Sequence, residues 1–478
     1  MNDWTDLVED ALLGTNRRDS PDLLDRAAAC TLARRAGLRP APAPETPAPA
    51  PLDHRPPLPA TAARRLASLL AESGSELLPQ WLGTARSRGF APPPALVPPL
   101  LDAARQRSDL RGDAVALAGP LGRWLAEVNP DWRYVLRVPA VGQDGEQHDH
   151  TDDAAAWEEG LFAERVTQLT RLRRRDPAAG LALLRSTWRT ERAEDRLLFL
   201  DALQEGLGPA DEQFLEEALA DRAKNVRATA AELLSTLPGS ALSTRMAARA
   251  REAVKVTAEG RLAVEPPTAC DAAMQHDGIA PTSPTGRGDR AFWLGEVIAA
   301  TPLSCWTELL GPPELVLSLP MTPAWAEELH EAWARAAVRQ HAAAWARALL
   351  TRHQGRGTSG TQSRLLSVLP PVERAAWTAR FVLEQGPAEA FQLLVTCPPP
   401  WPEELADAVL DALAHVAGSG AYPWSHSGVL GVAERSLPFA AAARADALAE
   451  ASSPAWAEVF TRLATTVRTR SAMLAELA

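Results

Sequence analysis

The sequence predicts an all-α protein built from many short helices, and three observations support this prediction. Ala, Leu, Arg and Glu, which are all strong helix formers, dominate the 478 residues. β-branched residues are sparse, and long alternation of apolar and polar residues is nearly absent. Most of the 41 prolines fall between segments with apolar residues at helical spacing, where proline can start or stop a helix.

The overall composition is that of an ordinary globular protein. Hydrophobic residues make up 46% and charged residues 23% of the chain, and 49 Lys and Arg against 60 Asp and Glu give a formal net charge of −11. No segment approaches the ~18 to 20 uninterrupted apolar residues of a membrane-spanning helix. The acidic opening, Met1 to Asp6, lacks the basic start of a signal peptide.

The chain has four cysteines, Cys30, Cys270, Cys305 and Cys397. They lie far apart, which fits a reducing compartment better than a disulfide framework. We therefore expect a cytoplasmic protein that does not contact a membrane.

Five regions follow one another along the chain. They are N-terminal helices at 1–37, a linker at 38–60, a helical region at 61–267, a second linker at 268–290 and a Trp-rich helical region at 291–478. The first linker is rich in Pro and Ala, so we expect an extended, polyproline-like connector. The second is rich in Gly, Pro, Ser and Thr, and we expect it to be the main boundary between two halves.

The N-terminal region is predicted to contain two helices. Trp4, Val8 and Leu12 belong to an apolar pattern with a 3.6-residue period, which Gly14 ends. Ser20 and Pro21 have the composition of a helix start, and Gly37 closes the second helix.

Two short stretches depart from the helical pattern. Residues 132–138, with the sequence WRYVLRV, are the first plausible strand. Residues 255–267 are predicted to form a small hairpin that turns at Glu259 and Gly260. We expect these to be short irregular or hairpin insertions in a helical protein.

Residues 157–250 give the clearest indication of architecture. Helix pairs recur there at roughly 35 to 45 residues, which is the length range of helical repeats. Each pair leaves one apolar face that only a neighbouring pair can cover, so stacking of pairs into an α-solenoid is the natural solution.

One segment in this region, Asp221 to Leu234, resembles the second half of a HEAT repeat. It has an Asp, then Val-Arg a few residues on, then Ala and Leu at helical spacing. The resemblance implies that Asp221 and Arg227 bridge neighbouring repeats. It also implies that apolar residues stack between repeats, namely Val226, Leu233 and Leu234.

Residues 4–18, with the sequence WTDLVEDALLGTNRR, resemble the opening of an uncharacterised bacterial domain-of-unknown-function family. Residues 211–216, together with the Asp221 segment, are similar to its central region, and the resemblance spans most of the chain. Members are often encoded beside MoxR-type AAA ATPases, von Willebrand factor A-domain proteins and SWIM zinc-finger proteins. The resemblance thus implies a role in such a system. It brings no catalytic residues and no cofactor.

One cluster of side chains has the chemistry of a metal site. His148, His150 and Asp152 lie in the segment HDHTDD, and zinc prefers imidazole and carboxylate ligands. The alternative interpretation is a solvated acidic loop, because loops hold ligands poorly unless other elements order them.

A basic run ends one predicted helix, and its arginines are Arg171, Arg173, Arg174 and Arg175. Such a run can bind phosphate groups. It can also simply oppose the negative end of the helix dipole while staying solvated. The net charge of −11 argues against a nucleic-acid partner.

These observations leave three functional hypotheses. The first is a non-enzymatic helical-repeat scaffold or adaptor that binds a protein partner, such as an AAA ATPase or a von Willebrand factor A-domain protein. The second is a nucleic-acid-binding protein similar to HEAT-like DNA glycosylases, with the Arg171 to Arg175 run on its groove. The third is a metal-dependent enzyme that uses His148, His150 and Asp152.

Overall fold

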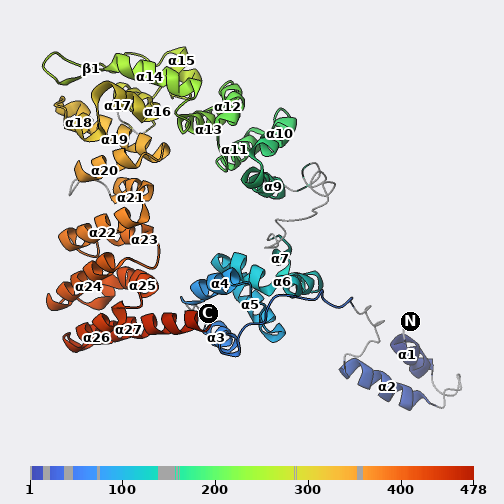
Figure 1. The fold of residues 1–478 in the computed structure, drawn as a ribbon. Coiled ribbons are helices and arrows are strands. Elements are labelled where there is room, and N and C mark those ends of the chain that lie inside the picture. The colour runs from blue at the N-terminus through green and yellow to red at the C-terminus, as the bar shows by residue number, and fades with distance from the viewer. Residues whose placement is uncertain are drawn as a thin grey trace.

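The fold is a long succession of short helices (Figure 1). The computed structural model describes residues 3–13, 22–36, 47–72, 76–137, 157, 160, 162–284, 286, 288–352 and 359–478. Secondary structure in these residues is helical apart from one two-stranded hairpin and two isolated bridges, which confirms a mostly helical fold.

The helices fall into consecutive groups along the chain. The first group is α1 (Asp3–Leu13) and α2 (Leu23–Ala36). The second is α3 (Ala60–Ala71), α4 (Leu78–Ser87), α5 (Val97–Gln106), α6 (Arg111–Val128) and α7 (Tyr134–Arg137). The third is α9 (Phe162–Arg175), α10 (Pro177–Thr187), α11 (Ala193–Ala202), α12 (Glu212–Ala218), α13 (Lys224–Ser235), α14 (Ala241–Ala253), α15 (Ala272–His276) and α16 (Asp289–Ala300).

The last group runs to the C-terminus. Its helices are α17 (Leu303–Leu310), α18 (Pro313–Ser318), α19 (Pro323–Arg339), α20 (Ala343–Arg352), α21 (Ser359–Val368), α22 (Pro371–Gln385), α23 (Phe391–Thr396), α24 (Glu403–Gly418), α25 (Ser427–Ser436), α26 (Ala441–Glu450) and α27 (Pro454–Ala475). Short 3₁₀ turns precede several helices, among them η3 (Pro130–Trp132) and η5 (Pro423–His426).

The hairpin predicted around Glu259 and Gly260 is confirmed. Strands β1 (Val254–Val256) and β2 (Leu262–Val264) pair in antiparallel fashion, with Val256 opposite Leu262. Gly260 has a φ of +70°, a left-handed conformation that glycine adopts without steric cost.

The strand predicted at residues 132–138 is wrong, because this segment is helical up to Arg137. It forms the end of η3 and then α7. Two aromatic side chains fix it to α5: the Trp132 indole donates a hydrogen bond to Asp102 (3.0 Å), and the Tyr134 hydroxyl donates one to the carbonyl of Leu101 (2.7 Å). A lone strand here would leave its backbone groups unpaired, whereas a helical turn pairs them locally.

Residues 47–59 have no helix or strand, but they pack against the following helices. Pro120 interrupts α6 and has no N–H to offer the carbonyl of Ala116. Arg55 takes over this role, because its guanidinium donates to the carbonyls of Ala116 and Leu117 at 2.9 Å each. Hydrogen bonding from Arg55 also lowers the pKa of Asp53 below its usual value.

Most helices pack on their next-but-one neighbours. In the C-terminal part α22 packs on α24 and α24 on α26, while α21 packs on α23, α23 on α25 and α25 on α27. The helices therefore form two rows that advance together along the chain.

The hydrophobic core also follows the chain order. Its largest cluster runs from Trp157 to Leu393 and includes Met274 and Ile279. The expected boundary at 268–290 therefore does not interrupt the core. Tryptophans fill it: the ring of Trp333 lies 5.8 Å from those of both Trp306 and Trp345.

The C-terminal helix brings the chain back to its earlier part. Figure 1 shows α27 ending beside α3 and α4. Met473 and Leu477 are fully buried in the same cluster as Leu66 and Trp81. Helix α27 and the helices α3 and α4 thus share one hydrophobic core.

Polar contacts reinforce this closure. Arg65 of α3 forms an ion pair with Glu476 (2.8 Å), and both side chains are partly exposed. Arg470 of α27 is fully buried, and burial lowers its pKa. It donates to the side chain of Gln80 on α4 (2.9 Å) and to the carbonyl of Leu437 (2.7 Å). An arginine held by neutral acceptors therefore ties α27 to α4.

We predict that Met473→Ala or Leu477→Ala loosens α3 and α4. Each substitution removes a fully buried side chain, which costs about 2–5 kcal/mol at such sites. Hydrogen exchange should show faster exchange of amides in α3 and α4. Leu309→Ala is the control, because Leu309 is 52% exposed. Unchanged protection of α3 and α4 in both core variants would contradict the closure.

Candidate functional site

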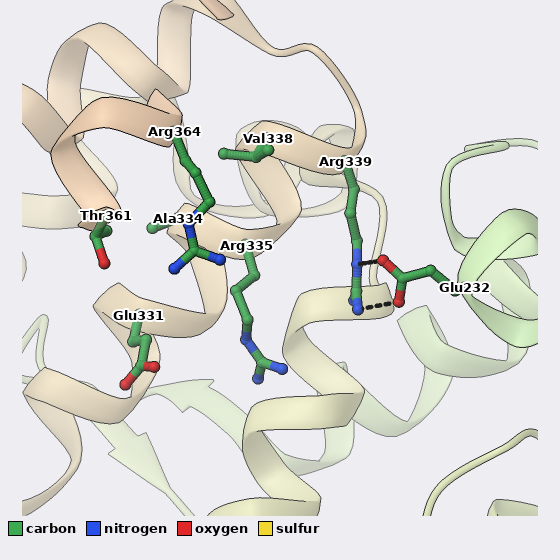
Figure 2. A pocket seen from close by; sticks show the side chains of 8 residues that line it. All are labelled: Glu232, Glu331, Ala334, Arg335, Val338, Arg339, Thr361 and Arg364. Carbon is green, nitrogen blue, oxygen red and sulfur yellow. Dashed lines mark hydrogen bonds and ion pairs between the residues drawn. The ribbon is translucent and has the colours of Figure 1, made fainter. Parts of the chain in front are cut away.

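A small charged cavity lies where α13, α19 and α21 meet (Figure 2). Its volume is about 150 Å³. It is lined by Glu232, Glu331, Ala334, Arg335, Val338, Arg339, Thr361 and Arg364, and we call it the arginine pocket. Charged side chains from three helices far apart in the sequence are thereby brought together.

The sequence of α19 explains how this helix serves both the core and the pocket. Glu331, Arg335 and Arg339 are spaced by four residues and so share one face. Leu329 and Trp333 are fully buried on another face, in the core. Burial of the apolar face therefore fixes the direction in which the charged face points.

Two of the pocket arginines are already paired. Arg339 makes a two-point ion pair with Glu232, in which its Nε donates to Oε1 at 2.7 Å (Figure 2). This pair joins α19 to α13 across 107 residues of sequence. Arg335 donates to Glu296 of α16 at 2.5 Å. Such bidentate or short contacts orient the guanidinium groups.

Arg364 is the exposed arginine of the pocket. Within the described residues its side chain makes one hydrogen bond, a long one of 3.4 Å from Nε to the carbonyl of Gly360. Figure 2 shows its guanidinium directed towards Arg335. As far as the described residues are concerned, Arg364 thus retains most of its donors for an external acceptor such as a carboxylate.

The size of the arginine pocket limits what it can hold. Pockets for drug-sized ligands and cofactors have volumes of roughly 300–1,000 Å³. A cavity of about 150 Å³ is close to the size that accepts one benzene-sized group. The pocket therefore suits a single side chain better than a whole cofactor.

The predicted basic run divides into one buried and three exposed arginines. Arg171, Arg174 and Arg175 are exposed, but Arg173 is only 1% exposed. Arg174 pairs with Glu205 at 2.6 Å, and this hydrogen bond lowers the pKa of Glu205. Arg173 therefore does not belong to a phosphate-binding surface.

Arg173 instead organises the turn between α11 and α12. Its guanidinium makes a two-point ion pair with Asp211 at 2.8 Å for both contacts. It also donates to backbone carbonyls, including those of Glu205 (2.9 Å) and Pro177 (2.6 Å). A Cβ at Gly180 would lie 2.7 Å from the Arg173 side chain, so glycine makes room for it.

The residues predicted to pack between repeats lie in the core. Val226, Leu233 and Leu234 are buried in the largest cluster. Asp221 forms an ion pair with Arg196 of α11 at 3.2 Å. Arg227 donates to the backbone carbonyls of Asp221 (2.8 Å) and Arg222 (3.1 Å). Asp221 therefore connects to α11, whereas Arg227 caps the turn before its own helix.

The predicted metal ligands His148, His150 and Asp152 lie outside the described residues. Within the part of the chain that the structure describes, no group of three or more His, Cys, Asp or Glu side chains is placed to hold a metal ion. No helix among the described residues is long and apolar enough to cross a membrane.

Sequence reasoning did not identify the arginine pocket. The spacing of Glu331, Arg335 and Arg339 was an available signal for a charged helix face. The approach of Glu232 and Arg364 had no local signal, because it depends on how α13 and α21 pack around α19.

The fold and its polar contacts define a mostly helical protein whose helices pack in series and return to α3 and α4. The chain belongs to a family of unknown function, DUF5691, whose model matches residues 6–477. This confirms the resemblance to a domain-of-unknown-function family. No curated protein and no solved structure matches the chain.

We predict that Arg173→Leu destabilises the protein by about 3–5 kcal/mol, because it leaves the Asp211 carboxylate buried without its partner. The double variant with Asp211→Leu should regain part of this loss, because the uncompensated charge is then removed. Chemical denaturation measures both effects.

Arg175→Leu is the matched control for this prediction. Arg175 is exposed at the end of α9, so its replacement should change stability by no more than about 0.5 kcal/mol. Equal denaturation midpoints for Arg173→Leu and Arg175→Leu would show that the buried pair has no structural role.

Proposed function

We propose that the protein is a non-enzymatic scaffold or adaptor with a HEAT-like solenoid architecture, and that it binds a protein partner. The family resemblance of its opening and central segments suggests the partner: a MoxR-type AAA ATPase, or a von Willebrand factor A-domain protein that works with one.

The packing of helices in two rows is the observation that supports this proposal most. α22, α24 and α26 form one row, and α21, α23, α25 and α27 form the other. Such serial stacking buries one face of each helix pair and leaves extended outer faces free for a partner. The segment from Asp221 to Leu234 supports the same interpretation, because its apolar residues are buried between neighbouring helices.

The arginine pocket is the contact point that we assign to the partner. Its volume suits one side chain, and Arg364 has guanidinium donors available. An acidic side chain of the partner would place its carboxylate against Arg364, beside the oriented guanidinium groups of Arg335 and Arg339. A charged pair in a desolvated pocket adds specificity as well as affinity.

We expect the full chain to form a stable complex with one of these two partner classes in a pull-down and in gel filtration. Arg364→Glu should weaken the complex roughly tenfold or more, because truncation or reversal of a buried charged contact commonly costs over 1.4 kcal/mol. Titration calorimetry or biolayer interferometry measures the dissociation constant.

Arg380→Glu is the matched control. Arg380 is an exposed arginine of α22 that does not line the pocket, and its replacement by glutamate makes the same change of charge. A chain that binds neither partner class at micromolar concentration would overturn the proposed function. A complex that tolerates Arg364→Glu and Arg380→Glu equally would retain the scaffold but exclude the arginine pocket as its contact.

A further inference from the structure

The first two helices form an antiparallel hairpin, which Figure 1 shows apart from the remaining helices. The end of α1 meets the start of α2, because Asp10 pairs with Arg26 at 3.0 Å. The start of α1 meets the end of α2, because the Arg34 guanidinium lies 4.6 Å from the centre of the Trp4 ring. We call α1 and α2 the N-terminal hairpin.

Each helix of the N-terminal hairpin has an apolar stripe whose side chains are exposed. The stripes are spaced by four residues and consist of Trp4, Val8 and Leu12 on α1 and of Leu24, Ala28 and Leu32 on α2. Leu12 is 82%, Leu24 83% and Leu32 69% exposed. Isolated exposed leucines are ordinary, but two parallel stripes of them are not.

The two stripes lie on the same side of the hairpin. Leu7 of α1 is buried and Leu23 of α2 is half-buried, and Val8 and Leu24 follow them by one position. One position is a rotation of about 100° in the same sense on each helix. Because the helices are antiparallel, equal rotations bring Val8 and Leu24 to one face, and each stripe winds on from there by about 40° for every four residues. We call this the apolar face of the hairpin.

The N-terminal hairpin has almost no core of its own. Among the residues of α1 whose burial is described, Leu7 and Asp10 are buried, and no residue of α2 is. Units below about 40 residues need a metal, a disulfide or oligomerisation to become stable. Helix pairs of this kind obtain stability by covering an apolar face with another pair.

We propose that the N-terminal hairpin is a dimerisation module, in which the apolar faces of two copies of the chain pack together as an antiparallel four-helix bundle. A twofold interface brings together the same apolar face of each copy. The family model begins at residue 6, so the hairpin is an integral part of the family unit.

The charges of the two helices select a second copy as the occupant. α1 has four acidic residues and no basic one, whereas α2 has three arginines and one aspartate. A twofold axis parallel to the helices places α1 of one copy against α2 of the other. Each acidic helix then faces the basic helix of the other copy across the interface, in addition to the basic helix of its own copy.

The test is the oligomeric state of the full chain, measured by light scattering after gel filtration over a range of concentrations. The proposal expects a dimer that becomes monomeric on dilution. Leu12→Glu and Leu24→Glu should each raise the dimer dissociation constant about a hundredfold or more, because the twofold symmetry duplicates every lost contact. Leu383→Glu on α22, at a 60% exposed leucine, is the matched control and should leave the dimer intact.

A crosslinking experiment keeps the proposal testable if the charged variants misfold. In a background with both Cys30→Ser and Cys270→Ser, one preparation has Leu12→Cys and a second has Leu24→Cys. Mixing and mild oxidation should give disulfides between the two different chains, because α1 faces α2 of the other copy.

Three outcomes would overturn the proposal. The first is a monomer at every micromolar concentration tested. This includes a monomer in which the rest of the same chain protects the backbone amides of the hairpin leucines from hydrogen exchange. The second is a dimer that persists in both Leu12→Glu and Leu24→Glu. The third is a dimer without mixed disulfides.

Discussion

The architecture depends on the contact that α27 makes with α3 and α4. Serially stacked helices interact mainly with their neighbours, so the two ends of such a path are ordinarily independent. Here Met473 and Leu477 complete the core beneath α3 and α4, and Arg470 ties α27 to α4 through Gln80. This contact joins residues separated by 390 positions or more, and it converts a linear succession of helices into one closed unit.

The sequence predicted local structure well and long-range contacts poorly. Helical periodicity, proline positions and the turn at Gly260 are local signals, and they led to the correct class and to the hairpin. Arg173 is an example of such a long-range contact. Its position in a basic run indicated a solvated surface, but hydrogen bonds to Asp211 and to nearby carbonyls hold its side chain in the interior. The strand expected at 132–138 failed similarly, because contacts with α5 outweighed its β propensity.

The charged groups of the protein divide into structural and available ones. Arg55, Arg173 and Arg470 satisfy backbone carbonyls where helices kink, turn or meet, so their charge serves the fold. Arg364 lies at the surface of a small pocket with few contacts of its own. The functional proposal follows from this division, since recognition needs donors that the fold has not already used. The same reasoning applies to the apolar groups of the N-terminal hairpin. Its leucines are exposed, so they are available for contact with another chain.

The most direct test of the central claim is a distance measurement between α3 and α27. Spin labels at Ser68→Cys and Ala472→Cys, each about one helical turn from Arg65 and Glu476, would be attached after Cys30 and Cys270 are replaced by serine. Dilution with unlabelled chain restricts the measurement to distances within one copy. Closure predicts a single narrow distance distribution at short range. A broad distribution that extends to long distances would mean that the helical path is open.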